Sequence, residues 1–198
     1  MFEAIGQFET FSVAMPEMVH NRAMHHLLFY YHQQRRQENL CFGVWRPSVG
    51  TQRFTGLVHS LVLPREGEIE LDGNVSFTGA YLARASQLAA EADSGLVLMH
   101  NHFGPGWQDM SPDDIATEKK RAPFALASTG LPLLGMTLGT DGAWSARFWP
   151  RTAPKQYERQ SCATVRVVGS RLSTTYHPEL HPTPMYGEEL LRTISAWG

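Results

Sequence analysis

The apolar residues of this chain recur with two different spacings. Short apolar runs, which are typical of buried β-strands, occupy 38–45, 54–63, 96–99, 133–138 and 143–149. Apolar residues three or four positions apart predict helices that begin near Pro16, over 76–92 and over 112–127. The first of these helices is expected to bury Met18, Met24 and Leu27. Elements in this order predict an α/β fold, in which helices cover a mixed β-sheet.

One predicted strand ends in two histidines, His100 and His102. Side chains alternate between the faces of a strand, so residues two positions apart point in the same direction. A loop rich in glycine and proline follows, and Ser111 then begins a helix with Pro112 at its first position. Asp114 lies in the first turn of that helix, where its carboxylate can reach back toward the histidines.

Two imidazoles and one carboxylate, with a fourth position open, form the ligand set of a catalytic zinc site. Each part alone has an ordinary explanation, because a His-x-His pair is often two strand residues and Ser-Pro-Asp-Asp often only caps a helix. Their conjunction favours one zinc ion per chain, held by His100, His102 and Asp114. His59 and the histidines of the first helix are expected to be strand or surface side chains, not ligands.

The pattern His100-x-His102-x8-Ser111-x-x-Asp114 resembles the JAMM motif of the JAB/MPN metalloproteases. The resemblance covers about residues 15–150 and implies a JAB/MPN-like, cytidine-deaminase-like mixed sheet flanked by helices. Enzymes of that family cut isopeptide or peptide bonds after the C-terminal tail of ubiquitin or a ubiquitin-like protein. This chain differs from the usual motif by one extra residue before the serine and by Phe103 in place of a proline. The whole stretch is most similar to bacterial JAB domains fused to ThiF-like, ubiquitin-activating-type adenylyltransferases.

The resemblance also implies catalytic roles for residues outside the ligand set. Glu38, at the start of the strand after the first long helix, matches the glutamate that serves the family as general acid and base. A solvated carboxylate is the alternative for Glu38, and Glu66, Glu68 and Glu70 are the rival candidates. Ser111 would stabilise the oxyanion, or it would only cap the helix.

Two aromatic residues, Phe103 and Trp107, lie in the loop beside the predicted site. Either they line a groove that binds the substrate, or they pack the loop. The sequence leaves both interpretations open.

Composition and charge narrow the class of partner. A chain of 198 residues is expected to hold one main domain with room for an appended segment. A net charge of −2 gives no basic surface for nucleic acid. Cys41 and Cys162 are too few for a disulfide framework, which favours reduced thiols in a cytoplasmic protein. No signal peptide or run of transmembrane length is visible, so no membrane partner is expected.

A change of composition after residue 150 predicts a domain boundary. Residues 1–150 are expected to form the JAB/MPN metalloprotease domain. Residues 151–198 are expected to form a linker or extension, with a hairpin at 165–172 and a helix start at 187–197. In the fused family such a segment leads into the adenylyltransferase, so this chain is expected to be a fragment that ends before that domain. The expected partners are therefore a ubiquitin-like protein or its conjugates, with a fused or associated adenylyltransferase and a conjugating enzyme.

Other functions remain open at this point. The sequence His100-Asn101-His102 also resembles the RadC branch of the superfamily, which would imply a nucleic-acid role, although the mild acidity disfavours it. A non-catalytic MPN scaffold is a further possibility, but such proteins typically lose the ligands that this chain keeps. Within the favoured chemistry, both deconjugation and precursor processing remain open.

Overall fold

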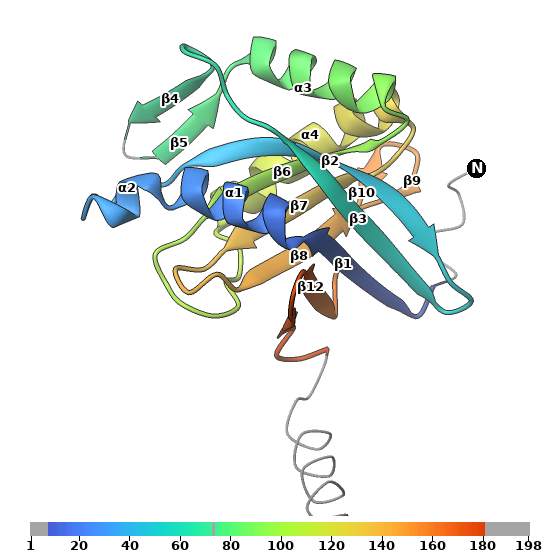
Figure 1. Ribbon diagram of the computed structural model, residues 1–198. Helices are drawn as coiled ribbons and strands as arrows, with labels where there is room; N and C mark the ends of the chain where they lie inside the picture. The colour runs from blue at the N-terminus through green and yellow to red at the C-terminus, as the bar shows by residue number, and fades with distance from the viewer. Residues whose placement is uncertain (1–7, 73, 181–198) are drawn as a thin grey trace, which may run out of the picture.

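The computed structural model describes residues 8–72 and 74–180, and its main feature is a large curled mixed sheet (Figure 1). In this part of the chain the strand order of the sheet is β11-β8-β7-β6-β2-β3-β1-β12-β13. Its strands are β1 (Thr10–Pro16), β2 (Leu40–Val49), β3 (Arg53–Val62), β6 (Gly95–Asn101), β7 (Leu133–Leu138), β8 (Trp144–Trp149), β11 (Gln160–Ser161), β12 (Thr164–Val168) and β13 (Leu172–Tyr176). Two small ribbons lie outside it, β4 (Ile69–Asp72) with β5 (Asn74–Phe77) and β9 (Arg151–Ala153) with β10 (Gln156–Tyr157).

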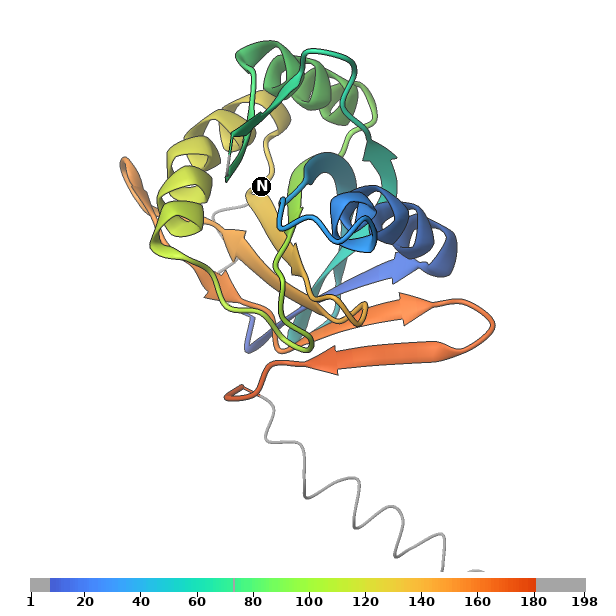
Figure 2. The same cartoon turned by 90° about the vertical axis from the view of Figure 1, so that its left-hand side faces the viewer.

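Helices cover both faces of the sheet (Figures 1 and 2). One face carries α1 (Glu17–Leu27), which the short α2 (Phe29–His32) follows, and the other carries α3 (Gly79–Glu91) and α4 (Pro112–Thr129). Strand β6 supplies both cores by alternation. Val97 and Met99 pack into the core beneath α1, whereas Leu96 and Leu98 pack beneath α3 and α4. The predicted α/β class, with helices flanking a mixed sheet, is confirmed.

Three local predictions need correction. Helix α1 buries Val19, Ala23 and Leu27, whereas Met18 is 77% exposed, so its buried face is rotated from the predicted one. The second predicted helix begins only at Gly79, because 74–77 pair with β4 as a strand. Glu38 was expected as the first residue of a strand, but β2 begins at Leu40 and Glu38 lies in the preceding loop.

The connections bring three segments to one edge of the sheet. Strand β2 runs antiparallel to β6, with Leu40 opposite His100, so the start of β2 lies beside the end of β6. Strands β6 and β7 are parallel, and the chain passes between them through α4. The carboxyl end of β6 and the N-terminus of α4 therefore meet beside Glu38, in the loop that precedes β2. The carboxyl ends of strands are where open α/β sheets commonly bind ligands.

The residues beyond 150 return to the main sheet. Strand β11 pairs with β8, β12 pairs in parallel with β1, and β13 pairs with β12. The hairpin expected at 165–172 is present as β12 and β13, over a longer stretch. The helix start expected at 187–197 lies outside the described residues. Within the described chain, each helix is too short or too polar to cross a bilayer.

Candidate metal centre

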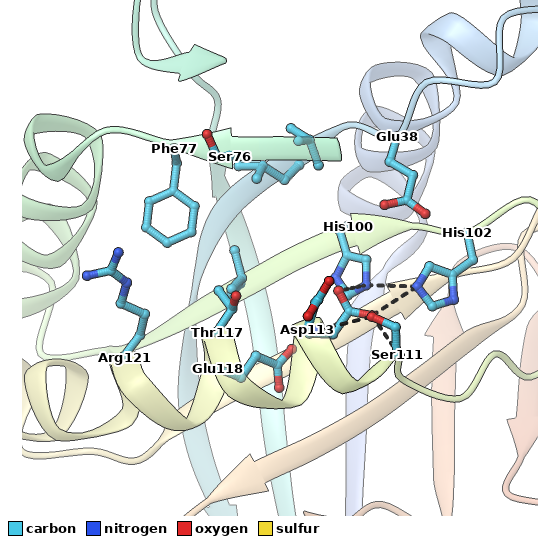
Figure 3. A pocket seen from close by; sticks show the side chains of 14 residues that line it. Glu38, Ser76, Phe77, His100, His102, Ser111, Asp113, Thr117, Glu118 and Arg121 are labelled. Atoms are coloured by element: carbon cyan, nitrogen blue, oxygen red, sulfur yellow. Dashed lines mark hydrogen bonds and ion pairs between the residues drawn. The ribbon is translucent and has the colours of Figure 1, made fainter. Parts of the chain in front are cut away.

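Three side chains converge at the end of β6 (Figure 3). Nε2 of His100 lies 3.2 Å from Nε2 of His102, which lies 3.2 Å from Oδ2 of Asp114. The second carboxylate oxygen, Oδ1, lies 3.5 Å from Nε2 of His100. His100 is buried, and the other two residues are partly buried. Within the described part of the chain this group could hold a metal ion, because its ligand atoms all lie within 4.8 Å of one another.

A capping box fixes the carboxylate of Asp114 at the start of α4. Oγ of Ser111 accepts a hydrogen bond from the backbone N–H of Asp114 at 3.2 Å, and Oδ2 of Asp114 accepts from the backbone N–H of Ser111 at 2.9 Å. The Ser111 hydroxyl also donates to Oδ2 at 2.7 Å. Burial raises the pKa of Asp114, but hydrogen bonds with His100 and His102 more than offset this and hold the pKa far below its usual range. The lowered pKa therefore keeps this carboxylate anionic, the form in which it could bind a metal ion.

Glu38 faces this group across a pocket. It precedes Leu40, the residue opposite His100 in the register, by two positions, and all three residues line the pocket. The residue is partly buried, and Figure 3 shows its carboxylate directed toward the two histidines. Burial raises the pKa of Glu38, while the imidazoles of His100 and His102 oppose the rise. A carboxylate with a raised pKa beside an open metal position has the properties of a general base.

Asn101, between the two histidines, faces the opposite side of β6 and anchors the loop of Glu38. Oδ1 of Asn101 accepts a hydrogen bond from the backbone N–H of Asn39 at 2.8 Å. The backbone N–H of Asn101 in turn donates to the carbonyl oxygen of Asn39 at 3.3 Å. Sequence reasoning gave Asn101 no role in the site. A polar residue on the side of β6 that otherwise packs Val97 and Met99 was the available signal.

A buried ion pair is connected to the site through Thr137. Oγ1 of Thr137 lies 3.5 Å from Nε2 of His100 and accepts a hydrogen bond from Nη1 of Arg147 at 2.7 Å. Arg147 also pairs with Glu118, and the two side chains are only 3% and 1% exposed. Nε1 of Trp149 donates to Oε2 of Glu118 at 2.6 Å. The sequence analysis did not predict this network. The available signal was that Glu118 lies one turn after Asp114 on α4, so the two side chains share a face of the helix.

The pocket has a volume of about 500 Å³ and extends well beyond the three ligands. It runs along α4, past Thr117, to Phe77 on β5 and Arg121 (Figure 3). The lining residues are Glu38, Leu40, Val75, Ser76, Phe77, Leu98, His100, His102, Ser111, Asp113, Asp114, Thr117, Glu118 and Arg121. His100, His102 and Asp114, called the metal group below, therefore lie at one end of an elongated pocket.

No protein-family model and no curated protein matches this chain.

The two loop aromatics do not line this pocket. The guanidinium carbon of Arg36 lies 5.8 Å from the ring centroid of Phe103. The ring of Trp107 lies 4.6 Å from that of His177 and lines a separate cavity of about 130 Å³. Neither Phe103 nor Trp107 is among the residues that line the larger pocket.

The rival glutamates and the remaining histidines make other contacts. Glu68 forms an ion pair with Arg84, and Glu66, Glu68 and Glu70 do not line the pocket. In the first helix, His20 accepts a hydrogen bond from Trp144.

Cys41 and Cys162 are buried free thiols, and burial raises the pKa of Cys41 to about 12.

Proposed function

We propose that this protein is a zinc-dependent isopeptidase or peptidase of the JAB/MPN type. Its substrate would be a bacterial ubiquitin-like protein, cut after the C-terminal tail during deconjugation or precursor processing. The observation that carries the proposal is the convergence of His100, His102 and Asp114 at one end of a pocket, with Glu38 facing them. The mixed sheet with helices on both faces agrees with a JAB/MPN-like, cytidine-deaminase-like fold.

The spacing of the ligand atoms fits zinc. Zinc–nitrogen bonds of 2.0–2.1 Å in a tetrahedron place neighbouring ligand atoms about 3.3 Å apart. The two Nε2 atoms lie 3.2 Å apart, Nε2 of His102 lies 3.2 Å from Oδ2 of Asp114, and Nε2 of His100 lies 3.5 Å from the other carboxylate oxygen, Oδ1. Two imidazoles and one carboxylate also leave a fourth position for water, as in other hydrolytic zinc sites.

The chain supplies the remaining groups for hydrolysis. A zinc ion in this site would lower the pKa of a bound water toward ~7. Glu38 would accept the proton of the attacking water and later deliver it to the leaving amine. Ser111 lines the pocket beside Asp114, where its hydroxyl can donate a hydrogen bond to the developing oxyanion. In the present arrangement that hydroxyl donates to Asp114, so the helix cap and the oxyanion contact would use the same group.

Metal content and cleavage test the proposal together. Protein purified without added metal should contain about one zinc ion per chain by elemental analysis. It should cleave a reporter fused to the C-terminal tail of a ubiquitin-like protein, whereas the His100→Ala variant should not. Failure to bind zinc, even after reconstitution, would overturn the proposal. Cleavage of nucleic acid and not of the fusion would point instead to the RadC-like function.

A further inference from the structure

The end of the pocket opposite the metal group holds Arg121, which has no anionic partner within the described part of the chain. Nε of Arg121 is buried and has no hydrogen-bond partner among the described residues, and none of the ion pairs found there includes Arg121. Its guanidinium carbon lies 5.2 Å from the ring centroid of Phe77, which fixes one face of the guanidinium by a cation–π contact. A buried donor without a partner is costly, and an anionic ligand would satisfy it.

The other acids near this end are already paired or lie at the metal end. Glu118 lines the pocket, but its carboxylate binds Arg147 and Trp149. Asp113 and Asp114 are in the first turn of α4, two turns before Arg121. Among the residues that line the pocket, Arg121 is therefore the cation at the end away from the metal group whose charge no carboxylate neutralises.

Helix geometry sets the distance between the two ends. Asp114 and Arg121 are seven positions apart, so they project from the same face of α4 about 10 Å apart along its axis. An extended peptide advances about 3.3 Å per residue, so the same distance corresponds to about three residues. Val75, Leu98 and Thr117 line the pocket between these ends.

We propose that Arg121 and Phe77 form a specificity subsite for an acidic side chain of the substrate. Because the proposed substrate is cut after its C-terminal tail, we place the tail in this pocket, so that the acid is the third residue before the one that carries the scissile carbonyl, with apolar or small residues between them. Two charge-assisted hydrogen bonds from the guanidinium to the carboxylate give the recognition. This inference rests on the proposed function, since it places the scissile carbonyl at the metal group. It narrows the substrate to tails with aspartate or glutamate at that position.

Peptide binding tests the subsite without requiring turnover. The probes for binding are fluorescein-labelled peptides Xaa-Leu-Ala-Gly-Gly, in which the first Gly carries the scissile carbonyl. The probes for cleavage are Xaa-Leu-Ala-Gly amides of an aminocoumarin, in which the single Gly carries it. In both sets Xaa is Glu, Gln or Lys. Anisotropy should show about 10- to 100-fold tighter binding of the Glu peptide than of the Gln peptide, as expected for a charge-assisted pair. The same ratio should appear in kcat/KM for the coumarin set.

Variants at one helix position separate charge from packing. Arg121→Gln should reduce the Glu-to-Gln ratio to about one, Arg121→Lys should retain part of it, and Arg121→Glu should favour the Lys peptide. The control is Lys119→Gln, which removes an exposed charge from the same helix and should leave the ratio unchanged. Equal binding of the three peptides by the parent protein, including no measurable binding, would overturn the subsite. So would a ratio that survives in Arg121→Gln.

The two proposals fail in different ways. Charge-selective binding without cleavage of any peptide would contradict the peptidase function and leave the subsite supported. Cleavage of all peptides at equal rates would support the peptidase and overturn the subsite.

Discussion

The carboxylate of Glu118 occupies the space that a side chain at position 135 would need. A Cβ atom on Gly135 would lie 2.1 Å from Oε2 of Glu118 and 2.4 Å from its Cδ. Gly135 lies in β7, directly above the buried pair that Glu118 forms with Arg147. The absence of a side chain at 135 is therefore what allows an ion pair to be buried beneath the candidate metal centre.

Replacing Gly135 with alanine should destabilise the protein strongly. The added methyl group would displace a carboxylate that is held by Arg147 and Trp149, so the cost should exceed the ~1–3 kcal/mol typical of overpacking. Urea unfolding measures the change. Gly79→Ala is the matched control and should be close to neutral, because among the described residues its added Cβ would meet nothing within 4 Å beyond its chain neighbours and the backbone of its own helix. Equal stabilities of the two variants would contradict the packing argument.

Breaking the buried ion pair should cost far more than breaking an exposed one. Glu118→Gln leaves Arg147 charged and buried, for which we expect a loss of about 3–5 kcal/mol in the free energy of unfolding. Asp109→Asn breaks the exposed contact with Arg159 and should cost less than about 1 kcal/mol. Denaturant titration of both variants tests the contrast. The double variant Glu118→Leu with Arg147→Met should be less damaged than Glu118→Gln, and a larger loss would contradict this account.

Asn101 should affect catalysis more than metal binding. Asn101→Ala removes the acceptor that holds the backbone of Asn39, so the adjacent Glu38 would lose its fixed position. We expect about 10- to 100-fold lower kcat, by analogy with the loss of a residue that orients a metal-site group, with zinc content unchanged. Asn101→Asp keeps the acceptor and should recover part of the activity. Loss of zinc in Asn101→Ala at an unchanged fold would show that Asn101 supports the ligands instead.

Glu38→Gln should separate metal binding from chemistry. Glutamine keeps the size of the side chain but cannot accept the proton, so hydrolysis should fall by ~10²–10⁴-fold while zinc remains bound. His100→Ala or Asp114→Ala should instead lose zinc and activity together. Elemental analysis and cleavage rates, measured side by side, decide between these patterns. Cleavage by Glu38→Gln at the parent rate would show that Glu38 is not the general base and would leave Glu66, Glu68 and Glu70 as the next candidates.

His20 should make the stability of the protein sensitive to mild acid. Burial lowers the pKa of His20, an effect that Glu17 opposes, and Nδ1 of His20 accepts a hydrogen bond from Nε1 of Trp144 at 2.9 Å. The folded state therefore favours the neutral ring, so this contribution is fully present above the unfolded pKa of about 6.5 and is lost progressively as the pH falls from there through the lower pKa of the folded state. Unfolding at pH 7.5 and 5.5 should show a larger loss for the parent than for His20→Gln, which cannot titrate. Equal losses would exclude His20 as the cause.

The sequence by itself determined the local parts of the candidate site. Alternation along one strand put His100 and His102 on the same side, and the hydrogen bonds of a capping box join Ser111 and Asp114 within a single turn. These arrangements depend on residues close in the chain, so their spacing is enough to predict them. The rotated face of α1 shows the limit, since Met18 and Val19 are both apolar and only the packing of the helix decides which is buried.

Only the tertiary structure decided which distant groups serve the site. The contact between Asn39 and Asn101 joins residues 62 positions apart, and the pair of Glu118 with Arg147 joins residues 29 apart. The pairing of Arg121 with Phe77 likewise requires β5 to lie over α4. Such contacts depend on strand register and on how a helix packs against the sheet. Local propensity does not encode either of these, because both are set by burying the two apolar faces of the sheet at once.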